Sequence, residues 1–240
     1  MKFTGERVVP NKTPKRIVQD HIERYAFAAQ YVKKKNVLDI ACGAGYGTSM
    51  LAKSGAEYVT GVDNSIEAIE YAQRKYSHDA LTFIEDDAEK LSFPNNSFDV
   101  VVSFETIEHV SQYKSFISEV HRVLKKKGIL ILSSPNRTIT SPNIVLGGKP
   151  LNPFHFCEFT KEELLSVLSG KFKGIVFFGQ RFTPVFFTRR KVRKGISGIE
   201  RIFSLGIKKK IFEEGTGPKV TKKSSTFWIP RYYVALGQKR

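Results

Sequence analysis

A short apolar run that ends in closely spaced glycines constrains the fold of this chain more than any other feature. Residues 37–47 read Val-Leu-Asp-Ile-Ala-Cys-Gly-Ala-Gly-Tyr-Gly, which is typical of a buried strand followed by a turn whose backbone can approach a ligand. Asp63 follows a second apolar run, where a carboxylate can accept hydrogen bonds from both ribose hydroxyls of a nucleoside. These features predict a nucleoside site at the carboxyl ends of parallel strands.

Apolar runs and helical patterns alternate along the chain, as they do in βαβ units. Strands are predicted at 37–40, 58–62, 81–84, 98–104, 129–132, 174–178 and 232–236. Helices are predicted at 15–32, 48–54, 65–76, 114–125 and 160–169. The expected fold class is therefore α/β: a doubly wound, mostly parallel seven-stranded sheet with an N-terminal helix and a basic insertion between the last two strands.

Length and charge favour a single domain with one unusual segment. The chain has 240 residues and a formal net charge of +16, yet residues 181–227 hold 13 Lys and Arg against 3 Asp and Glu. We expect one domain over 1–240, divided into the segments 1–34 (N-terminal helical cover), 35–180 (cofactor-binding core with a lid at 135–159), 181–227 (basic insertion) and 228–240 (last strand).

Localisation is predicted from the cysteines and from apolar runs. Cys42 and Cys157 do not form a disulfide framework, and the first residues lack the apolar stretch of a secretory signal. We therefore expect a cytoplasmic protein. Residues 189–212 have a basic amphipathic pattern, which indicates peripheral contact with the inner membrane surface; a solvated or partner-binding surface is the alternative.

The identity of the nucleoside ligand depends on charge and on the glycine spacing. A dinucleotide fingerprint from Gly43 needs a third glycine at position 48, where this chain has Thr48. The loop 41–52 contains no Lys or Arg, and acidic residues follow the first three strands. Such surroundings suit a cationic cofactor without phosphates, and S-adenosyl-L-methionine carries both an ammonium and a sulfonium.

Several blocks, in a fixed order, resemble class I S-adenosylmethionine-dependent methyltransferases of the type 11 group, which includes quinone-biosynthesis and small-molecule enzymes. The similar blocks are 37–47, 59–65, 87–94, 97–104, 105–110 and 121–131. The resemblance covers about residues 35–135 and implies a Rossmann-like methyltransferase fold and a transferase of the EC 2.1.1 class. Lys126-Lys127-Gly128 departs from the usual Pro-Gly-Gly, which we expect to change only a turn.

The resemblance also implies which residues bind the cofactor. They belong to the glycine turn and to the strand ends that follow it: Asp39, Ala41, Gly43, Gly45, Gly47, Asp63, Asn64, Asp87, Ala88 and Phe104. Asp39 would orient the turn and help to hold the ammonium, and Asp87 would accept from the adenine amino group, with Asp86 as the alternative. Near the N-terminus, Arg24 could clamp the cofactor carboxylate and Tyr25 could cover it; both could instead be surface-helix residues.

Two histidines follow the strands whose ends should face the acceptor. His109 comes after the fourth predicted strand and His155 lies in the lid, and histidine is readily tuned for proton abstraction near neutral pH. We favour His155 as the catalytic base over His109, although a structural role is open for each. His155 with Glu158 offers only two metal ligands, so no metal site is predicted.

The function expected is O-methylation of a small molecule or saccharide, which could be lipid-linked, by direct displacement. One alternative is a nucleic-acid (RNA) methyltransferase that uses the basic segment, although residues 104–106 read Phe-Glu-Thr and not the Asn/Asp-Pro-Pro-aromatic signature of base-amino methylation. Another alternative is a non-catalytic scaffold that binds the cofactor. Neither the acceptor atom nor the oligomeric state follows from the sequence.

Overall fold

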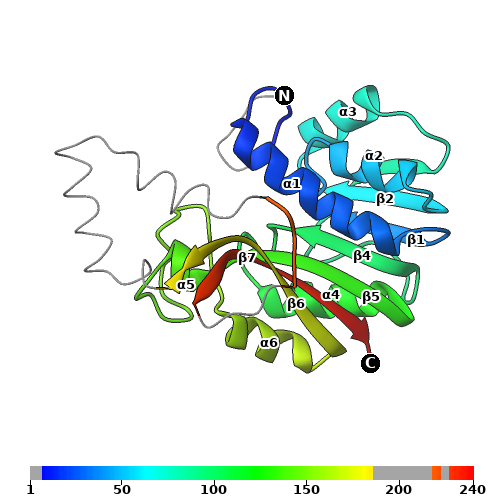
Figure 1. Ribbon diagram of the computed structural model, residues 1–240. Coiled ribbons are helices and arrows are strands. Elements are labelled where there is room, and N and C mark those ends of the chain that lie inside the picture. Colours follow the sequence, from blue (N-terminus) through cyan, green and yellow to red (C-terminus); the bar gives the residue numbers. More distant parts are fainter. Residues whose placement is uncertain (1–6, 186–217, 223–226) are drawn as a thin grey trace.

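The computed structural model describes residues 7–185, 218–222 and 227–240. Seven strands form one sheet in the order β3-β2-β1-β4-β5-β7-β6 (Figure 1). They are β1 (Asn36–Ile40), β2 (Tyr58–Asp63), β3 (Leu81–Glu85), β4 (Phe98–Phe104), β5 (Leu124–Pro135), β6 (Phe172–Pro184) and β7 (Trp228–Lys239). β7 is antiparallel to both of its neighbours, and the remaining pairs are parallel. The predicted doubly wound, mostly parallel sheet is therefore confirmed.

Helices cover both faces of the sheet (Figure 1). One face carries α1 (Lys15–Ala28), α2 (Tyr46–Lys53) and α3 (Ile66–Lys75), and the other carries α4 (Tyr113–Val123) and α6 (Lys161–Ser169). Two shorter helices are the 3₁₀ turn η1 (Ala29–Tyr31) and α5 (Arg137–Thr140). None of the helices in the described ranges is long and apolar enough to cross a bilayer.

The central strands are apolar on both faces because each face packs against helices. In β4, Val101 joins the core beneath α4 and α6, whereas Val100 and Val102 join the core beneath α1 and α2. All three side chains are at most 1% exposed. This alternation holds the ends of β1 and β4 rigidly between two helical layers.

The order of the strands places a crevice beside β1. The chain passes from β1 outward through β2 to β3, and then returns to the other side of β1 to form β4 and β5. Such a reversal leaves a crevice at the carboxyl ends of the strands, where open α/β sheets bind ligands.

Most element boundaries differ by a few residues from the sequence prediction: for example, α1 ends at Ala28 and not at residue 32, and β5 and β7 are longer than predicted at both ends. The helix predicted at 114–125 ends at Val123, because Leu124 already pairs with Phe98 as the first residue of β5. β6 continues to Pro184 and so includes the first residues of the segment predicted as a basic insertion. Most of that segment, including residues 189–212, lies outside the described residues.

Candidate functional site

A cavity of about 380 Å³ opens at the carboxyl edge of the sheet. The predicted site residues that line it are Arg24, Tyr25, Ala41, Gly43, Asp63, Asn64, Asp87, Ala88, Phe104, His109 and His155. Three further predicted residues, Asp39, Gly45 and Gly47, are not among those that line it. The cavity therefore brings residues from the N-terminal helix, four strand ends and the lid around one space.

The glycine turn between β1 and α2 packs closely against neighbouring helices. Gly45 has a left-handed backbone (φ 77°), and an added Cβ there would lie 2.6 Å from an alanine side chain of α3. An added Cβ at Gly47 would lie 2.0 Å from Cζ of Tyr25 in α1. These two glycines thus allow helix packing, while Ala41 and Gly43 face the cavity.

Asp39 is a fully buried carboxylate beneath this turn. Its Oδ2 accepts hydrogen bonds from Thr48 Oγ1 at 2.7 Å and from the Tyr25 hydroxyl at 3.2 Å. Burial raises the pKa of Asp39 to about 7, although these two hydrogen bonds oppose the shift. Asp39 therefore connects α1 to α2 and binds a proton more readily than an exposed aspartate does.

Asp63 ends β2 and presents its carboxylate at the wall of the cavity. Its Oδ2 accepts from the Gly43 backbone N–H at 2.9 Å, and its Oδ1 accepts from the Ser65 N–H at 3.0 Å. Arg7 lies across the same carboxylate, with Nη2 3.3 Å from Oδ1. The second strand end is thereby fixed to the glycine turn, and Arg7 partly neutralises it.

Asp86 and Asp87 follow β3 and both line the cavity. Asp86 accepts three hydrogen bonds within its own loop, from the Asp87 N–H and from the N–H and hydroxyl of Ser92. Asp87 accepts one, from the Glu89 N–H at 2.8 Å. Asp87 therefore has the greater capacity to accept a hydrogen bond from a ligand.

Arg24 places a guanidinium, 1% exposed, at the side of the cavity nearest α1. Its Nη2 lies 3.7 Å from Glu105 Oε1, and its guanidinium stacks on the Tyr232 ring at 4.5 Å. Its Nε and Nη1 are buried and lack a hydrogen-bond partner among the described residues. Buried donors without a partner are costly, so this geometry suits an anionic ligand group.

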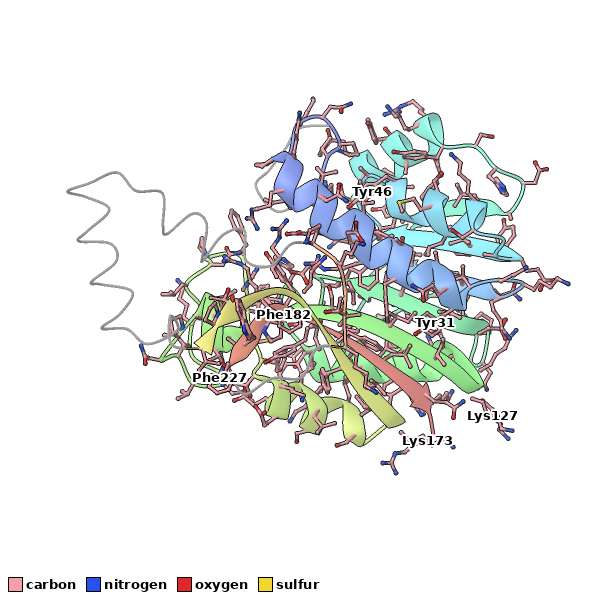
Figure 2. The ribbon with its side chains drawn as sticks, in the orientation of Figure 1. Tyr31, Tyr46, Lys127, Lys173, Phe182 and Phe227 are labelled. Atoms are coloured by element: carbon pink, nitrogen blue, oxygen red, sulfur yellow. The ribbon has the colours of Figure 1, made fainter. Side chains whose placement is uncertain are left out.

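Aromatic side chains line the space beside Arg24. The Tyr25 ring meets Phe104 edge-on at 5.0 Å and Tyr46 at 5.8 Å. Tyr46, labelled in Figure 2, lies beside α1 at the start of α2. Together these rings form an apolar wall between the glycine turn and the end of β4.

Two glutamates follow β4, and neither was predicted as a site residue. Glu105 has a positive φ of 51° and accepts a hydrogen bond from the Ser133 hydroxyl at 2.7 Å. Glu108 is 1% exposed, and its Oε2 has no hydrogen-bond partner among the described residues. Burial, and then the neighbouring Glu105 charge, raise the pKa of Glu108 well above its usual value. Glu108 therefore binds a proton more readily than an exposed glutamate does.

The two predicted histidines meet at the lid side of the cavity. The rings of His109 and His155 are 4.7 Å apart and nearly perpendicular. His109 Nδ1 lies 3.2 Å from the Phe154 carbonyl oxygen, which holds the lid loop against the segment after β4. The sequence separated these histidines by 46 positions, so only the fold could show that they are neighbours.

His155 belongs to a buried polar network within the lid. Its Nδ1 lies 2.6 Å from Glu158 Oε1, and its Nε2 lies 2.8 Å from Asn152 Nδ2. Burial opposes ionisation of Glu158, but hydrogen bonds from His155, Thr140 and Ser141 hold its pKa below the usual value. Glu158 is therefore ionised beside the imidazole.

Within the part of the chain that the structure describes, one group of side chains could hold a metal ion. Ligand atoms of Glu108, His109 and His155 all lie within 4.8 Å of one another. In this arrangement the Asn152 amide already contacts Nε2 of His155. A metal at that nitrogen would have to displace the amide.

Residues from distant parts of the chain complete the site. Those that were not predicted as cofactor or catalytic residues include Arg7, Asp20, His21, Tyr46, Glu105, Glu108 and Tyr232. Glu105 directly follows Phe104 and Glu108 directly precedes His109 in the sequence, so their positions could have indicated that they belong to the site. Tyr232 comes from β7, and no local pattern connects it to Arg24.

Comparisons with known proteins agree with this geometry. Residues 38–132 match the family described as a methyltransferase domain. A protein named "Probable S-adenosylmethionine-dependent methyltransferase" from Mycobacterium tuberculosis (strain H37Rv) is 33% identical over 169 residues, which is 70% of this chain and 60% of that protein. The chain thus spans less than two thirds of the length of that relative.

Other relatives carry more specific names. A phthiotriol/phenolphthiotriol dimycocerosates methyltransferase of Mycobacterium ulcerans is 35% identical over 150 residues, covering 60% of this chain and 55% of the relative. A fatty-acid O-methyltransferase of Mycolicibacterium smegmatis is 35% identical over 121 residues, covering 47% and 44%. Among solved structures, the YcgJ protein of Bacillus subtilis superposes with a TM-score of 0.63 at 19% identity, over 92% of this chain and 99% of that one.

Proposed function

We propose that this chain methylates a hydroxyl group of a small, largely apolar or lipid-linked acceptor. The chain belongs to the class I S-adenosylmethionine-dependent methyltransferase family through residues 38–132. One continuous cavity supports this proposal more than any other observation. It has acceptors for a nucleoside at one end and a pair of histidines at the other.

The cavity fits S-adenosylmethionine in charge and in hydrogen-bonding groups. Arg24 has buried donors without a partner, which suit the methionine carboxylate. The carboxylate of Asp63 would accept hydrogen bonds from the ribose hydroxyls, and Asp87 would accept one from the adenine amino group. Arg7, which contacts the same Asp63 carboxylate, would move aside or close over the ribose. When bound, this cofactor supplies a methyl group activated by the positive charge of its sulfonium.

The residues of the chain would then orient the acceptor and remove its proton. Alignment of the reacting groups in a closed cavity can contribute about 7–11 kcal/mol, and a base typically adds roughly 10²- to 10⁴-fold. His155 is the base that we favour, because it combines a position in the cavity with a buried carboxylate partner. His109 is the second candidate, and its ring lies beside His155.

The lid favours an apolar acceptor. Five large apolar side chains of this loop are exposed: Val145 (74%), Leu146 (39%), Leu151 (66%), Phe154 (53%) and Phe156 (63%). Phe227, at the β6–β7 end of the molecule, is 76% exposed (Figure 2). Exposed apolar surface beside a cavity is typical of binding surfaces, and two relatives are named for lipid acceptors. Contact of residues 189–212 with a membrane remains part of the proposal.

Transfer of an isotopically labelled methyl group tests this function directly. The protein is incubated with methyl-labelled S-adenosylmethionine and a host extract separated into lipid, aqueous small-molecule, polysaccharide and RNA fractions. We expect label in the lipid fraction or in the small-molecule fraction, in an alkali-stable methyl ether; label in an alkali-labile ester would indicate a carboxyl acceptor and would contradict the hydroxyl assignment. The Asp63→Ala protein is the control for cofactor-dependent transfer.

The other outcomes identify the alternatives. Label in RNA would favour a nucleic-acid methyltransferase and would contradict the proposal. Cofactor binding with no label in any fraction would favour a scaffold that binds the cofactor without turnover. Label on an amine or carbon atom would support methyl transfer but would contradict the assignment of an oxygen atom as the acceptor.

A further inference from the structure

The imidazole of His155 is held on both of its nitrogens. Nδ1 lies 2.6 Å from the Glu158 carboxylate and Nε2 lies 2.8 Å from the Asn152 side-chain nitrogen. The His155 side chain is 11% exposed, so the ring has little freedom to turn away from these partners. The positions of the hydrogens on these partners therefore decide which nitrogen of His155 carries a proton.

The orientation of the Asn152 amide is fixed independently of His155. Asn152 Oδ1 accepts a hydrogen bond from the Phe154 backbone N–H at 3.1 Å, which leaves Nδ2 to face the imidazole. An amide nitrogen can only donate, so Nε2 of His155 must accept and carries the lone pair. Nδ1 then bears the hydrogen and donates it to Glu158.

Burial and a hydrogen bond hold the Glu158 carboxylate in place. Its side chain is 1% exposed, and Thr140 Oγ1 donates to its Oε2 at 2.5 Å. At His109, by contrast, Nδ1 lies 3.2 Å from the neutral carbonyl oxygen of Phe154. A carboxylate stabilises an imidazolium ion more strongly than a neutral carbonyl does, so the two histidines are not equivalent.

We propose that Glu158 is the positioning residue for His155, and that Asn152 occupies the reactive nitrogen until an acceptor hydroxyl replaces its amide. The proposal rests on the proposed O-methylation. In the step, the acceptor hydroxyl gives its proton to Nε2 of His155, and the resulting imidazolium is balanced by the Glu158 carboxylate, which stays ionised. Glu158 touches neither acceptor nor cofactor and acts only through His155, in the manner of the acid in a catalytic triad.

Nitrogen NMR of the protein without ligands tests the protonation pattern. With ¹⁵N-labelled histidine side chains, His155 is assigned by loss of its signals in His155→Gln. We expect an unprotonated Nε2, a protonated Nδ1, and an Nδ1 proton far downfield because it is shared with a carboxylate. A proton on Nε2 would overturn the proposal. So would a His155 signal that changes on addition of EDTA, because it would place a metal on that nitrogen.

The titratable groups that face His155 are Glu158, Glu108 and His109. The spectrum is therefore repeated in His109→Ala. If Glu158 positions His155, the downfield Nδ1 proton persists in that variant. Its loss would show that His109 controls the protonation pattern and would contradict the proposal.

Kinetics of Glu158→Gln test the consequence for turnover. We expect kcat to fall about 10²-fold, with a downward shift or loss of the limb of the pH profile that reports the base, while the KM for the cofactor changes less than twofold. The matched control is Glu162→Gln, an exposed glutamate of α6, which should retain full kcat. Unchanged kcat in Glu158→Gln would overturn the proposal.

Two further measurements distinguish a wrong assignment of the base from a wrong assignment of its positioning residue. Thr140→Val removes only the hydroxyl that supports Glu158 and should give a smaller fall in kcat than Glu158→Gln, even if the latter folds poorly. If His155→Ala retains full turnover, the proposed base is wrong whatever the tautomer. If His155→Ala is inactive but Nε2 is protonated in the wild type, the result supports His155 as the base and contradicts the positioning role of Glu158.

Discussion

At the scale of single residues, two buried ionisable side chains lie where a charged ligand would stabilise them. Asp39 lies fully buried beneath the glycine turn, and Arg24 has guanidinium nitrogens without a partner among the described residues. Such groups destabilise an empty site, and strained or unpaired groups of this kind are concentrated at functional sites. Both should therefore respond strongly to substitution and to pH.

The raised pKa of Asp39, about 7, predicts a pH-dependent stability. In the unfolded chain this carboxyl ionises near pH 4, so between about pH 4 and 7 the folded state binds more protons and the unfolding free energy falls as pH rises. The slope from this one group is at most about 1.4 kcal/mol per pH unit. Urea unfolding at pH 5 and pH 7 should show a smaller fall in Asp39→Asn than in the wild type. Equal falls would contradict the assigned cause.

Gly47 offers a steric test of the same region. An added methyl group would lie 2.0 Å from the Tyr25 ring, so Gly47→Ala should cost about 1–3 kcal/mol and weaken cofactor binding by moving that ring. Gly170→Ala is the control, because nothing lies within 4 Å of its added Cβ. Thermal unfolding and calorimetric binding measure both effects. A Gly47→Ala protein as stable as Gly170→Ala would show that Tyr25 does not pack as described.

At the scale of elements, the sequence predicted which segments are strands and helices better than it predicted where they end. Ser65 caps α3 and Thr160 caps α6, as their residue types favour, and the side chain of each cap accepts from the first turn. The end of α4 was misplaced because Leu124 pairs with β4, a contact between distant segments. Likewise, Arg181 was counted in the basic insertion, yet it is buried at the end of β6.

That arginine connects β6 to the helix that covers the cavity. Arg181 Nε lies 2.6 Å from Asp20 Oδ1 of α1, and both side chains are less than 10% exposed. Removing one partner of a buried ion pair typically costs about 3–5 kcal/mol. Arg16, whose Nη1 lies 3.5 Å from Asp20 Oδ2, still partly compensates the remaining charge, so we expect a loss at the lower end of that range. Arg181→Met should therefore lower the unfolding free energy by about 3 kcal/mol and weaken cofactor binding through α1.

The exposed pair Arg74–Glu70 provides the matched control for this prediction. Arg74→Met should change the unfolding free energy by less than about 1 kcal/mol, because exposed ion pairs contribute little. Chemical unfolding of both variants gives the comparison. Similar small losses in the two variants would mean that the Arg181–Asp20 pair does not hold α1 on the sheet.

At the scale of the whole molecule, the reversal of strand order gathers the site from segments that are far apart in the sequence. The ends of β1, β2 and β4 supply the nucleoside side, while the lid after β5 supplies the histidine side. The ordered motifs predicted the first group well, since each lies at a strand end. Arg7 and Tyr232 could not be placed in the same way, because their positions depend on how the N-terminal segment and β7 close over the sheet.

Calorimetric titration of the intact protein with S-adenosylmethionine and, separately, with a nicotinamide dinucleotide tests the central claim most directly. We expect one-to-one binding of S-adenosylmethionine and of its demethylated product, at least tenfold weaker binding in Asp63→Ala, and no heat from the dinucleotide. Tight binding of the dinucleotide, with no response to the methyl donor or its product, would contradict the account.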